Sequence, residues 1–120
     1  MLARALAQQP QLLVLDEPTS HLDLRYQLQT AALLRRVNAE QGTTVLLVSH
    51  DLDLAAEVCD RLLLLDAGRL ARVGPPASVL EQGLLERVFR CPVAVDQNPT
   101  SGRPLVRVAW PSGPGAVRGR

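Results

Sequence analysis

Two carboxylates and a histidine stand in the sequence where they could catalyse a hydrolysis. Asp16 and Glu17 are adjacent and directly follow an apolar run at 12–15, and His50 follows a second apolar run at 43–49. Two neighbouring carboxylates at the end of a buried strand would repel each other and lose hydration, and a divalent cation that neutralises the first would remove this conflict. The second carboxylate could then face a reacting water. The alternative is that Asp16 and Glu17 merely begin a solvated loop, as charged residues commonly do.

The apolar pattern around these residues predicts two buried strands joined by a helix. The run at 12–15 is too short for a helix and is typical of a strand that is buried on both faces. Helical spacing of apolar residues predicts an amphipathic helix over 24–40, followed by a glycine where a C-terminal cap belongs, and the run at 43–49 predicts the next strand. His50 follows Asp16 by 34 positions, which is enough for a crossover helix and the next parallel strand. Both residues are therefore expected at the same edge of the sheet, where the ligands of α/β sheets gather.

The rest of the chain continues the alternation of strands and helices, which predicts an α/β domain with a mostly parallel sheet and flanking helices. A hairpin is expected over 61–74, where Gly68 supplies the turn. A helix over 77–89 is expected to be interrupted at Gly83. The other expected segments are a helix over 1–9, a helix over 51–59, two short strands within 91–95 and 103–109, and a disordered tail over 111–120.

Composition narrows the classes of protein to which the chain can belong. Its 120 residues are 47% hydrophobic, which is enough for one soluble domain with a core. A formal charge of +1 and 2% aromatic residues disfavour a dedicated nucleic-acid binder, which needs a basic surface and stacking rings. No apolar run reaches the roughly 18 residues that cross a bilayer, and the N-terminal segment lacks the cleavage site of a signal peptide. Cys59 and Cys91 match no metal or redox spacing, so both are expected to be ordinary thiols of a cytoplasmic protein.

The sequence resembles the ATP-binding cassette (ABC) ATPases in four segments, which occur in the order found in that family. "LLVLDEPTSHLD" resembles their Walker B segment and D-loop, and "VLLVSHD" resembles the segment that carries their switch histidine. "MLARALAQQP" is similar to the helix that precedes Walker B, and "DRLLLLDAGRLARVG" to the hairpin that follows the histidine. The resemblance covers about residues 1–74 and implies a partial P-loop NTPase-type fold.

The resemblance implies a role for each matched polar residue. Asp16 would hold Mg²⁺ through water, and Glu17 would orient or deprotonate the water that attacks the γ-phosphate of ATP. His50 would contact the γ-phosphate and the attacking water as a sensor. Phosphoryl transfer needs mainly positioning and charge stabilisation, which such groups can supply. Ser20 and Asp23 match the D-loop, which in this family crosses the interface between two ATPase subunits that enclose ATP.

Further segments resemble the ATPases of siderophore, haem and cobalamin importers. A histidine such as His21 is frequent in the D-loop of that subgroup, and the chain over 75–110 is similar to the subgroup's C-terminal extension. The resemblance therefore implies an ABC ATPase part over 1–74, an extension over 75–110 and a tail over 111–120. It also implies a membrane permease and a second ATPase subunit as partners, no nucleic acid, and a location on the cytoplasmic face of the inner membrane.

Two motifs of the complete family are missing from the sequence. No GxxxxGK[ST] pattern occurs, so no segment can cradle phosphates with backbone N–H groups and a lysine. The LSGGQ-type signature, which in the family precedes a segment like "LARALAQQP", is missing too. The chain thus resembles the C-terminal half of an ABC ATPase without the P-loop strand, whose loss leaves exposed strand edges. We expect weak or no ATP binding and no ATPase activity from the chain alone.

Two other classes of protein stay open at this point. Non-transport ABC ATPases of DNA repair and chromosome maintenance share the Walker B, D-loop and histidine segments, but they usually have a basic DNA-facing surface or long coiled-coil arms. This chain has neither heptads nor an excess of positive charge. The other alternative is a non-catalytic remnant that packs on a partner ATPase through residues 20–23.

Overall fold

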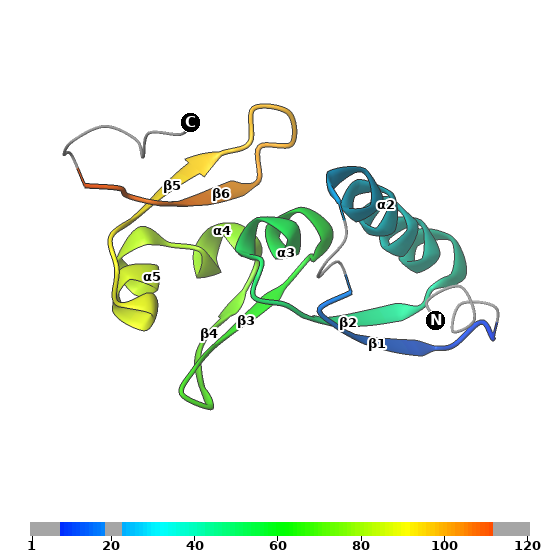
Figure 1. Ribbon diagram of the computed structural model, residues 1–120. Coiled ribbons are helices and arrows are strands. Elements are labelled where there is room, and N and C mark those ends of the chain that lie inside the picture. The colour runs from blue at the N-terminus through cyan, green and yellow to red at the C-terminus, as the bar shows by residue number, and fades with distance from the viewer. Residues whose placement is uncertain (1–7, 19–22, 112–120) are drawn as a thin grey trace.

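The computed structural model of the chain describes residues 8–18 and 23–111 (Figure 1). Two expected segments lie almost entirely outside these residues, namely the helix over 1–9 and the tail over 111–120. Gln8, the first described residue, lies in a turn. The described residues begin to form regular structure at the strand that precedes the two carboxylates.

Strands and helices alternate along the first half of the described chain, and two hairpins flank a pair of short helices in the second half (Figure 1). This order confirms the α/β class. The elements are β1 (Leu12–Asp16), α2 (Leu24–Gln41), β2 (Thr44–Val48), α3 (Leu52–Val58), β3 (Leu62–Asp66), β4 (Arg69–Gly74), α4 (Pro76–Val79), α5 (Gln82–Phe89), β5 (Val93–Gln97) and β6 (Pro104–Val108).

The six strands form three separate pairs instead of one mostly parallel sheet. β1 and β2 are parallel, and the register places Asp16 opposite Val48. β3 pairs with β4 and β5 pairs with β6, both in antiparallel hairpins. The expected parallel arrangement is therefore met only by β1 and β2. The physical reason is that the chain offers β3 only a tight-turn partner, β4, and no described strand bridges β3 to β2.

The helix α2 lies over the β1–β2 pair and has the expected ends (Figure 1). The Asp23 carboxylate caps its N-terminus by accepting the Tyr26 N–H at 3.0 Å. Gly42 ends it in the left-handed conformation with φ of +69°, and its N–H donates to the Asn38 carbonyl at 3.1 Å. These two caps fix the length of the crossover between the strands that carry the candidate site.

β1 is buried on one face only, which corrects the expectation of burial on both. Leu13 is 6% exposed, whereas Leu12 and Val14 are each 57% exposed. Side chains alternate along a strand, so Leu12 and Val14 share the face opposite to Leu13. No described element packs on that face, and the apolar composition of the strand therefore exceeds what the described residues bury.

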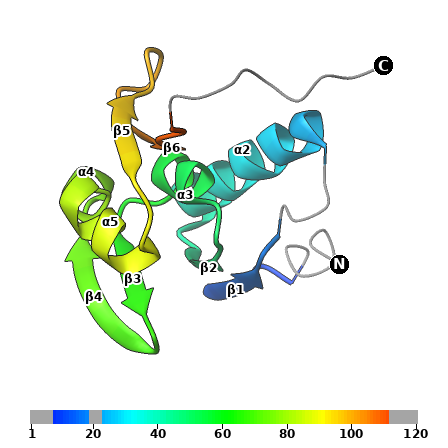
Figure 2. The same cartoon turned by 60° about the vertical axis from the view of Figure 1, so that its left-hand side comes forward.

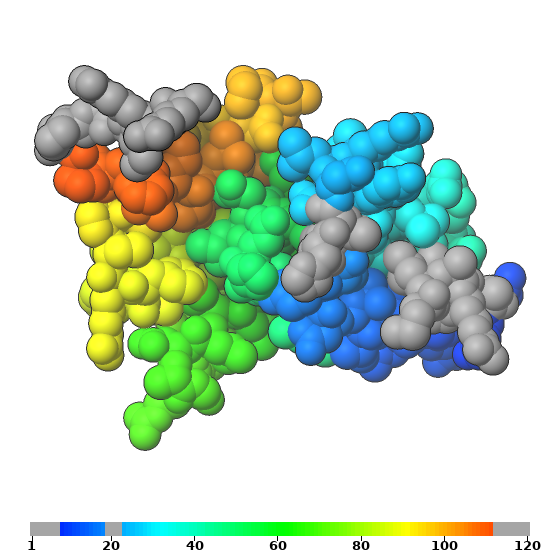
Figure 3. All heavy atoms as spheres, in the orientation of Figure 1, coloured from blue at the N-terminus to red at the C-terminus, as the bar shows by residue number. Residues whose placement is uncertain are grey.

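The main core draws on residues between positions 56 and 93 and so joins residues on both sides of position 74. It is a cluster of buried apolar side chains from α3, β3, α4, α5, β5 and the residue that follows α4: Ala56, Leu64, Val79, Leu80, Leu84, Leu85 and Val93. In the ribbon turned by 60°, α3 lies between α2 and the hairpin of β5 and β6 (Figure 2). The space-filling view shows the same central position for this green segment (Figure 3).

The helical segment over 77–89 breaks at Leu80 and Glu81, which corrects the expected interruption at Gly83. The Glu81 carboxylate accepts the Gly83 N–H at 3.1 Å and so caps the N-terminus of α5. Gly83 lies in the first turn of α5, where a missing side chain costs little. The break therefore comes from a capping carboxylate and not from the conformational freedom of glycine.

A groove of about 850 Å³ separates β2 from β3. Residues along the whole of β2 and most of β3 line it, and neither strand has a second strand partner among the described residues. Leu63 and Leu65, two of its apolar lining residues, are 61% and 60% exposed.

None of the described helices combines the length and the apolar character that crossing a membrane requires.

Candidate functional site

The two adjacent carboxylates predicted from the sequence lie where β1 ends. Asp16 is the last residue of β1, and Glu17 has a positive φ of +49°, which is uncommon for a residue with a side chain. The Glu17 N–H donates to the Val48 carbonyl at 2.7 Å, which extends the β1–β2 pairing by one residue. This bond holds the turn in place, so the carboxylate of Glu17 is directed toward the loop that follows β2.

Glu17 receives three contacts from that loop. Its Oε1 accepts the backbone N–H of His50 at 2.8 Å and lies 2.8 Å from His50 Nδ1. The Ser49 hydroxyl donates to Oε2 at 3.3 Å. The structure therefore brings together the two residues that the sequence placed 33 positions apart, at the carboxyl ends of the parallel strands. The sequence did not lead us to predict Ser49 as a site residue. Its position directly before the histidine was the sign that could have identified it.

The contact between Glu17 and His50 shifts the pKa of both groups. The hydrogen bond from the imidazole is the main cause that holds the pKa of Glu17 below its ordinary value, and the same bond with the nearby negative charge raises the pKa of His50. The side chains are 31% and 83% exposed, so water and salt screen the pair and it contributes little to stability. Its value is geometric: it keeps the carboxylate ionised and fixed in direction.

The pH dependence of this pair gives a first testable prediction. His50, with a raised pKa, stabilises the folded site fully below its ordinary pKa of 6.5, and this contribution is lost as the pH rises through the folded value. Glu17, with a lowered pKa, contributes above its ordinary value of 4.5 and loses the contribution as the pH falls through the folded value. The pair therefore contributes most between pH 4.5 and pH 6.5, and its contribution declines above and below this range.

Titration of the His50 ring by NMR measures the effect. We expect a midpoint above 6.5 that falls toward 6.5 in Glu17→Gln. Glu81→Gln is the matched control, because that carboxylate pairs with Arg72 and not with the histidine. A midpoint that stays the same in Glu17→Gln would show that the pair does not form in solution.

The other predicted site residues do not take part in the contact between Glu17 and His50. Asp16 is exposed, and its carboxylate has no hydrogen-bond or ion-pair partner among the described residues. Asp23 is engaged as the N-terminal cap of α2. Ser20 and His21 lie outside the described residues. Within residues 8–18 and 23–111, no three histidine, cysteine or acidic side chains gather as a metal cluster.

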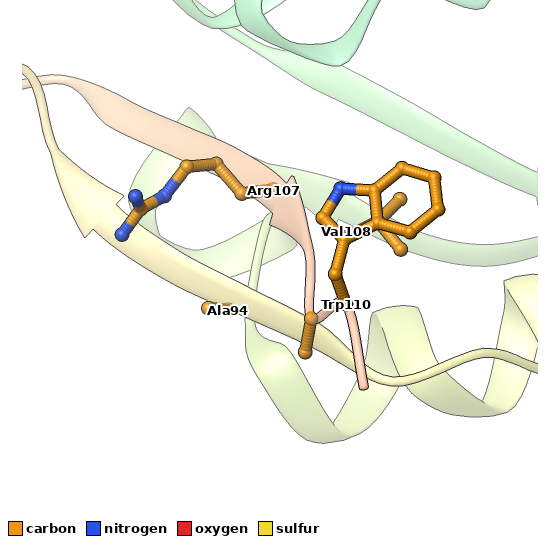
Figure 4. Close-up of a pocket in the computed structure, with 5 residues that line it drawn as sticks. Ala94, Arg107, Val108 and Trp110 are labelled. Carbon is orange, nitrogen blue, oxygen red and sulfur yellow. The ribbon is translucent and has the colours of Figure 1, made fainter. Parts of the chain in front are cut away.

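A second hollow lies at the end of the C-terminal hairpin and lacks the groups for such chemistry. It is lined by Ala94, Arg107, Val108, Ala109 and Trp110. In the close-up, Arg107 and Trp110 extend in different directions (Figure 4). Arg107 pairs with Asp96, so its charge is already neutralised within the hairpin. The arrangement of Glu17, Ser49 and His50 therefore remains the candidate site.

Two known sequences are similar to most of this chain. It is 51% identical over 105 residues to the hemin import ATP-binding protein HmuV of Rhodococcus jostii, a match that covers 88% of the chain and 36% of the relative. It is 50% identical over 105 residues to the hemin import ATP-binding protein HmuV of Streptomyces coelicolor, with 88% and 37% covered. The chain thus spans just over a third of the length of these relatives. No protein-family model matches it.

Two solved structures are similar to the fold. One is a metal-chelate type ABC transporter in an inward-facing conformation, with a TM-score of 0.79 and 28% identity, covering 91% of this chain and 44% of that chain. The other is CbiO1 from Clostridium perfringens, part of the ABC transporter complex CbiONQ, with a TM-score of 0.61 and 31% identity, covering 72% and 34%. These matches confirm the resemblance to the ATP-binding subunits of ABC transporters. By sequence and by fold, the chain is homologous to the C-terminal portion of the ATP-binding proteins of ABC transporters.

Proposed function

We propose that this chain supplies the hydrolytic part of the ATP-binding subunit of an ABC importer. The observation that carries the proposal is the contact between Glu17 and His50 at the carboxyl ends of two parallel strands. The names of the relatives favour hemin as the imported compound within the siderophore, haem and cobalamin class. In this role the chain works with a membrane permease and a second ATPase subunit at the cytoplasmic face of the inner membrane.

Glu17 holds the water that attacks the γ-phosphate. Its lowered pKa keeps it ionised at neutral pH, so it accepts a hydrogen bond from the water and orients it. A low pKa also makes it a weak base, which favours orientation over early proton removal. Because phosphoryl transfer depends mainly on position and charge, a fixed carboxylate is sufficient for this role.

His50 acts on the other side of the same water. Its Nδ1 faces Glu17, so Nε2 is the ring atom left to contact a phosphate oxygen. The side chain is 83% exposed, which leaves room for a nucleotide beside it. The ring therefore links the position of the carboxylate to the presence of the phosphate, as a sensor does.

Asp16 is the residue that would hold Mg²⁺ beside ATP. Mg²⁺ sites in such proteins commonly use one or two carboxylates, with waters and substrate phosphates completing the shell, and an exposed carboxylate without a described partner fits this pattern. When bound, Mg²⁺ supplies neutralisation of phosphate charge. Ser20 and Asp23 are proposed to face the second ATPase subunit.

The groove between β2 and β3 is an argument that the chain belongs to a larger ATPase domain. The Thr44 N–H donates to the Gln11 carbonyl, so alternate residues of β2 direct their backbone groups toward β1. The backbone N–H and C=O groups of Val45 and Leu47 therefore point the other way, toward the free edge of β2 along the groove. We infer that the remainder of the domain, including its phosphate-binding strand, completes the sheet here. Within this domain, residues 1–74 form part of the ATPase and residues 75–110 an extension.

The proposal is tested against a DNA-repair ATPase and a remnant by two binding measurements. We expect the chain, placed in a complete subunit, to co-purify with the permease of a hemin importer and to show no salt-sensitive binding to duplex DNA. Salt-sensitive DNA binding without the permease would instead establish the repair class. Failure of both, together with a poorly cooperative melt, would establish a remnant.

A further inference from the structure

The loop that carries His50 is joined rigidly to the helix α3. The Asp51 N–H donates to the Ser49 hydroxyl at 3.0 Å, and the Asp51 carboxylate caps α3 by accepting the Leu54 N–H at 3.1 Å. The backbone N–H of His50, in the middle of this unit, is bonded to Glu17. A displacement of α3 therefore displaces His50 relative to Glu17.

The C-terminal hairpin holds α3 near both of its ends. In the first turn, the Asp53 carboxylate accepts the Val106 N–H of β6 at 2.7 Å. At the other end, Arg103 Nη1 donates to the carbonyls of Ala56 and Cys59 at 2.8 and 3.0 Å. Two attachments at opposite ends of a helix fix its position along and around its axis. β6 lies beside α3 in both ribbon views (Figures 1 and 2).

The helix needs this support because it is short. α3 has seven residues, and an isolated helix of that length is not stable in water. Its last turn has no basic residue of its own. Arg103 supplies positive charge to the carbonyls of Ala56 and Cys59, and Arg35 of α2 does the same for the carbonyl of Glu57, at the end where the helix dipole favours a cation. A third contact, from the Ser101 hydroxyl to Glu57 Oε1 at 2.7 Å, adds to the same end.

We propose that the hairpin of β5 and β6 positions His50 against Glu17 through α3, with Arg103 and Asp53 as its two positioning residues. Neither residue touches the candidate site itself. The hairpin gives the extension over 75–110 a function: it keeps the histidine loop in the arrangement suited to hydrolysis. The importance of this arrangement for catalysis rests on the proposed function, whereas the mechanical link rests on the contacts of α3 alone.

The link is tested by NMR on the chain itself, at a pH where the His50 ring is neutral. The ionised Glu17 carboxylate accepts a hydrogen bond, so it favours the tautomer that has hydrogen on Nδ1, and ring ¹⁵N shifts report the share of this tautomer. We expect Arg103→Ala to reduce the Nδ1–H share to that of the same histidine in the urea-unfolded chain. Arg103→Lys, which keeps a cationic donor, should restore part of it.

Arg107→Ala is the matched control, because Arg107 lies on the same strand but pairs with Asp96 and has no contact with α3 among the described interactions. It should leave the tautomer unchanged. Asp53→Ala breaks the other attachment and should reduce the share even if Arg103→Ala does not fold, while Asp53→Asn keeps an acceptor and should not. A folded Arg103→Ala or Asp53→Ala chain with the parental tautomer would overturn the proposal. Because the readout needs no nucleotide, failure of the proposed ATPase role would leave the result standing.

Discussion

Glu17→Gln should reduce ATP turnover by about 100- to 10,000-fold in a complete ATPase that contains this chain, because glutamine lacks the negative charge with which Glu17 orients the attacking water and takes up its proton late in the reaction. The complete ATPase is a chimera in which this chain replaces the matched 105 residues of the Rhodococcus jostii relative. The amide retains the size of the side chain and can still accept the His50 N–H at its oxygen. ATP should therefore bind and remain unhydrolysed, and the loss should fall on kcat.

Steady-state phosphate release, together with retention of labelled ATP after gel filtration, measures this effect. Glu40→Gln is the control, since Glu40 is an exposed carboxylate on α2 away from the site. It should leave kcat and KM unchanged. Parental turnover in the Glu17→Gln chimera would remove Glu17 from the proposed role.

Leu85→Ala should lower the free energy of unfolding by about 2–5 kcal/mol, because it leaves a cavity in the shared core. Leu85 is 0% exposed and packs with residues of α3, β3, α4 and β5. Small domains have only about 5–15 kcal/mol of stability, so this loss is a large share of the total. Urea denaturation followed by circular dichroism gives the change in midpoint and slope.

Leu63→Ala is the matched control for the core. The side chain of Leu63 is 61% exposed on the groove, so its truncation should change the free energy of unfolding of the chain by less than about 0.5 kcal/mol. Equal losses for the two substitutions would show that the core around Leu85 is not the main source of stability.

The site was predictable because it depends on adjacent parallel strands. The apolar runs at β1 and β2, with the Gly42 cap between them, were sufficient to expect Glu17 and His50 at one sheet edge. The roles of these residues in hydrolysis stay predictions. The Ser49 contact was overlooked, since a hydroxyl beside a histidine has many equally plausible partners before the loop geometry is known.

Features that depend on distant segments could not be predicted from local patterns. The open face of β1 arises because no described element covers Leu12 and Val14, and an apolar run cannot reveal what is available to cover it. Likewise, the hydrogen bonds from Arg103 to the end of α3 join residues that are 44 or more positions apart in the sequence. The helix breaks at Glu81 because its carboxylate caps the next helix, whereas the sequence pattern predicts the break at Gly83.

The central claim is that this chain carries the groups for hydrolysis but not those that hold the phosphates. ATP turnover, measured side by side for the chain alone and for the chimera with the Rhodococcus jostii relative, tests it most directly. The claim predicts no turnover above buffer for the chain alone and clear turnover for the chimera. Turnover by the chain alone that is lost in Glu17→Gln, or an inactive chimera that folds and binds ATP, would contradict it.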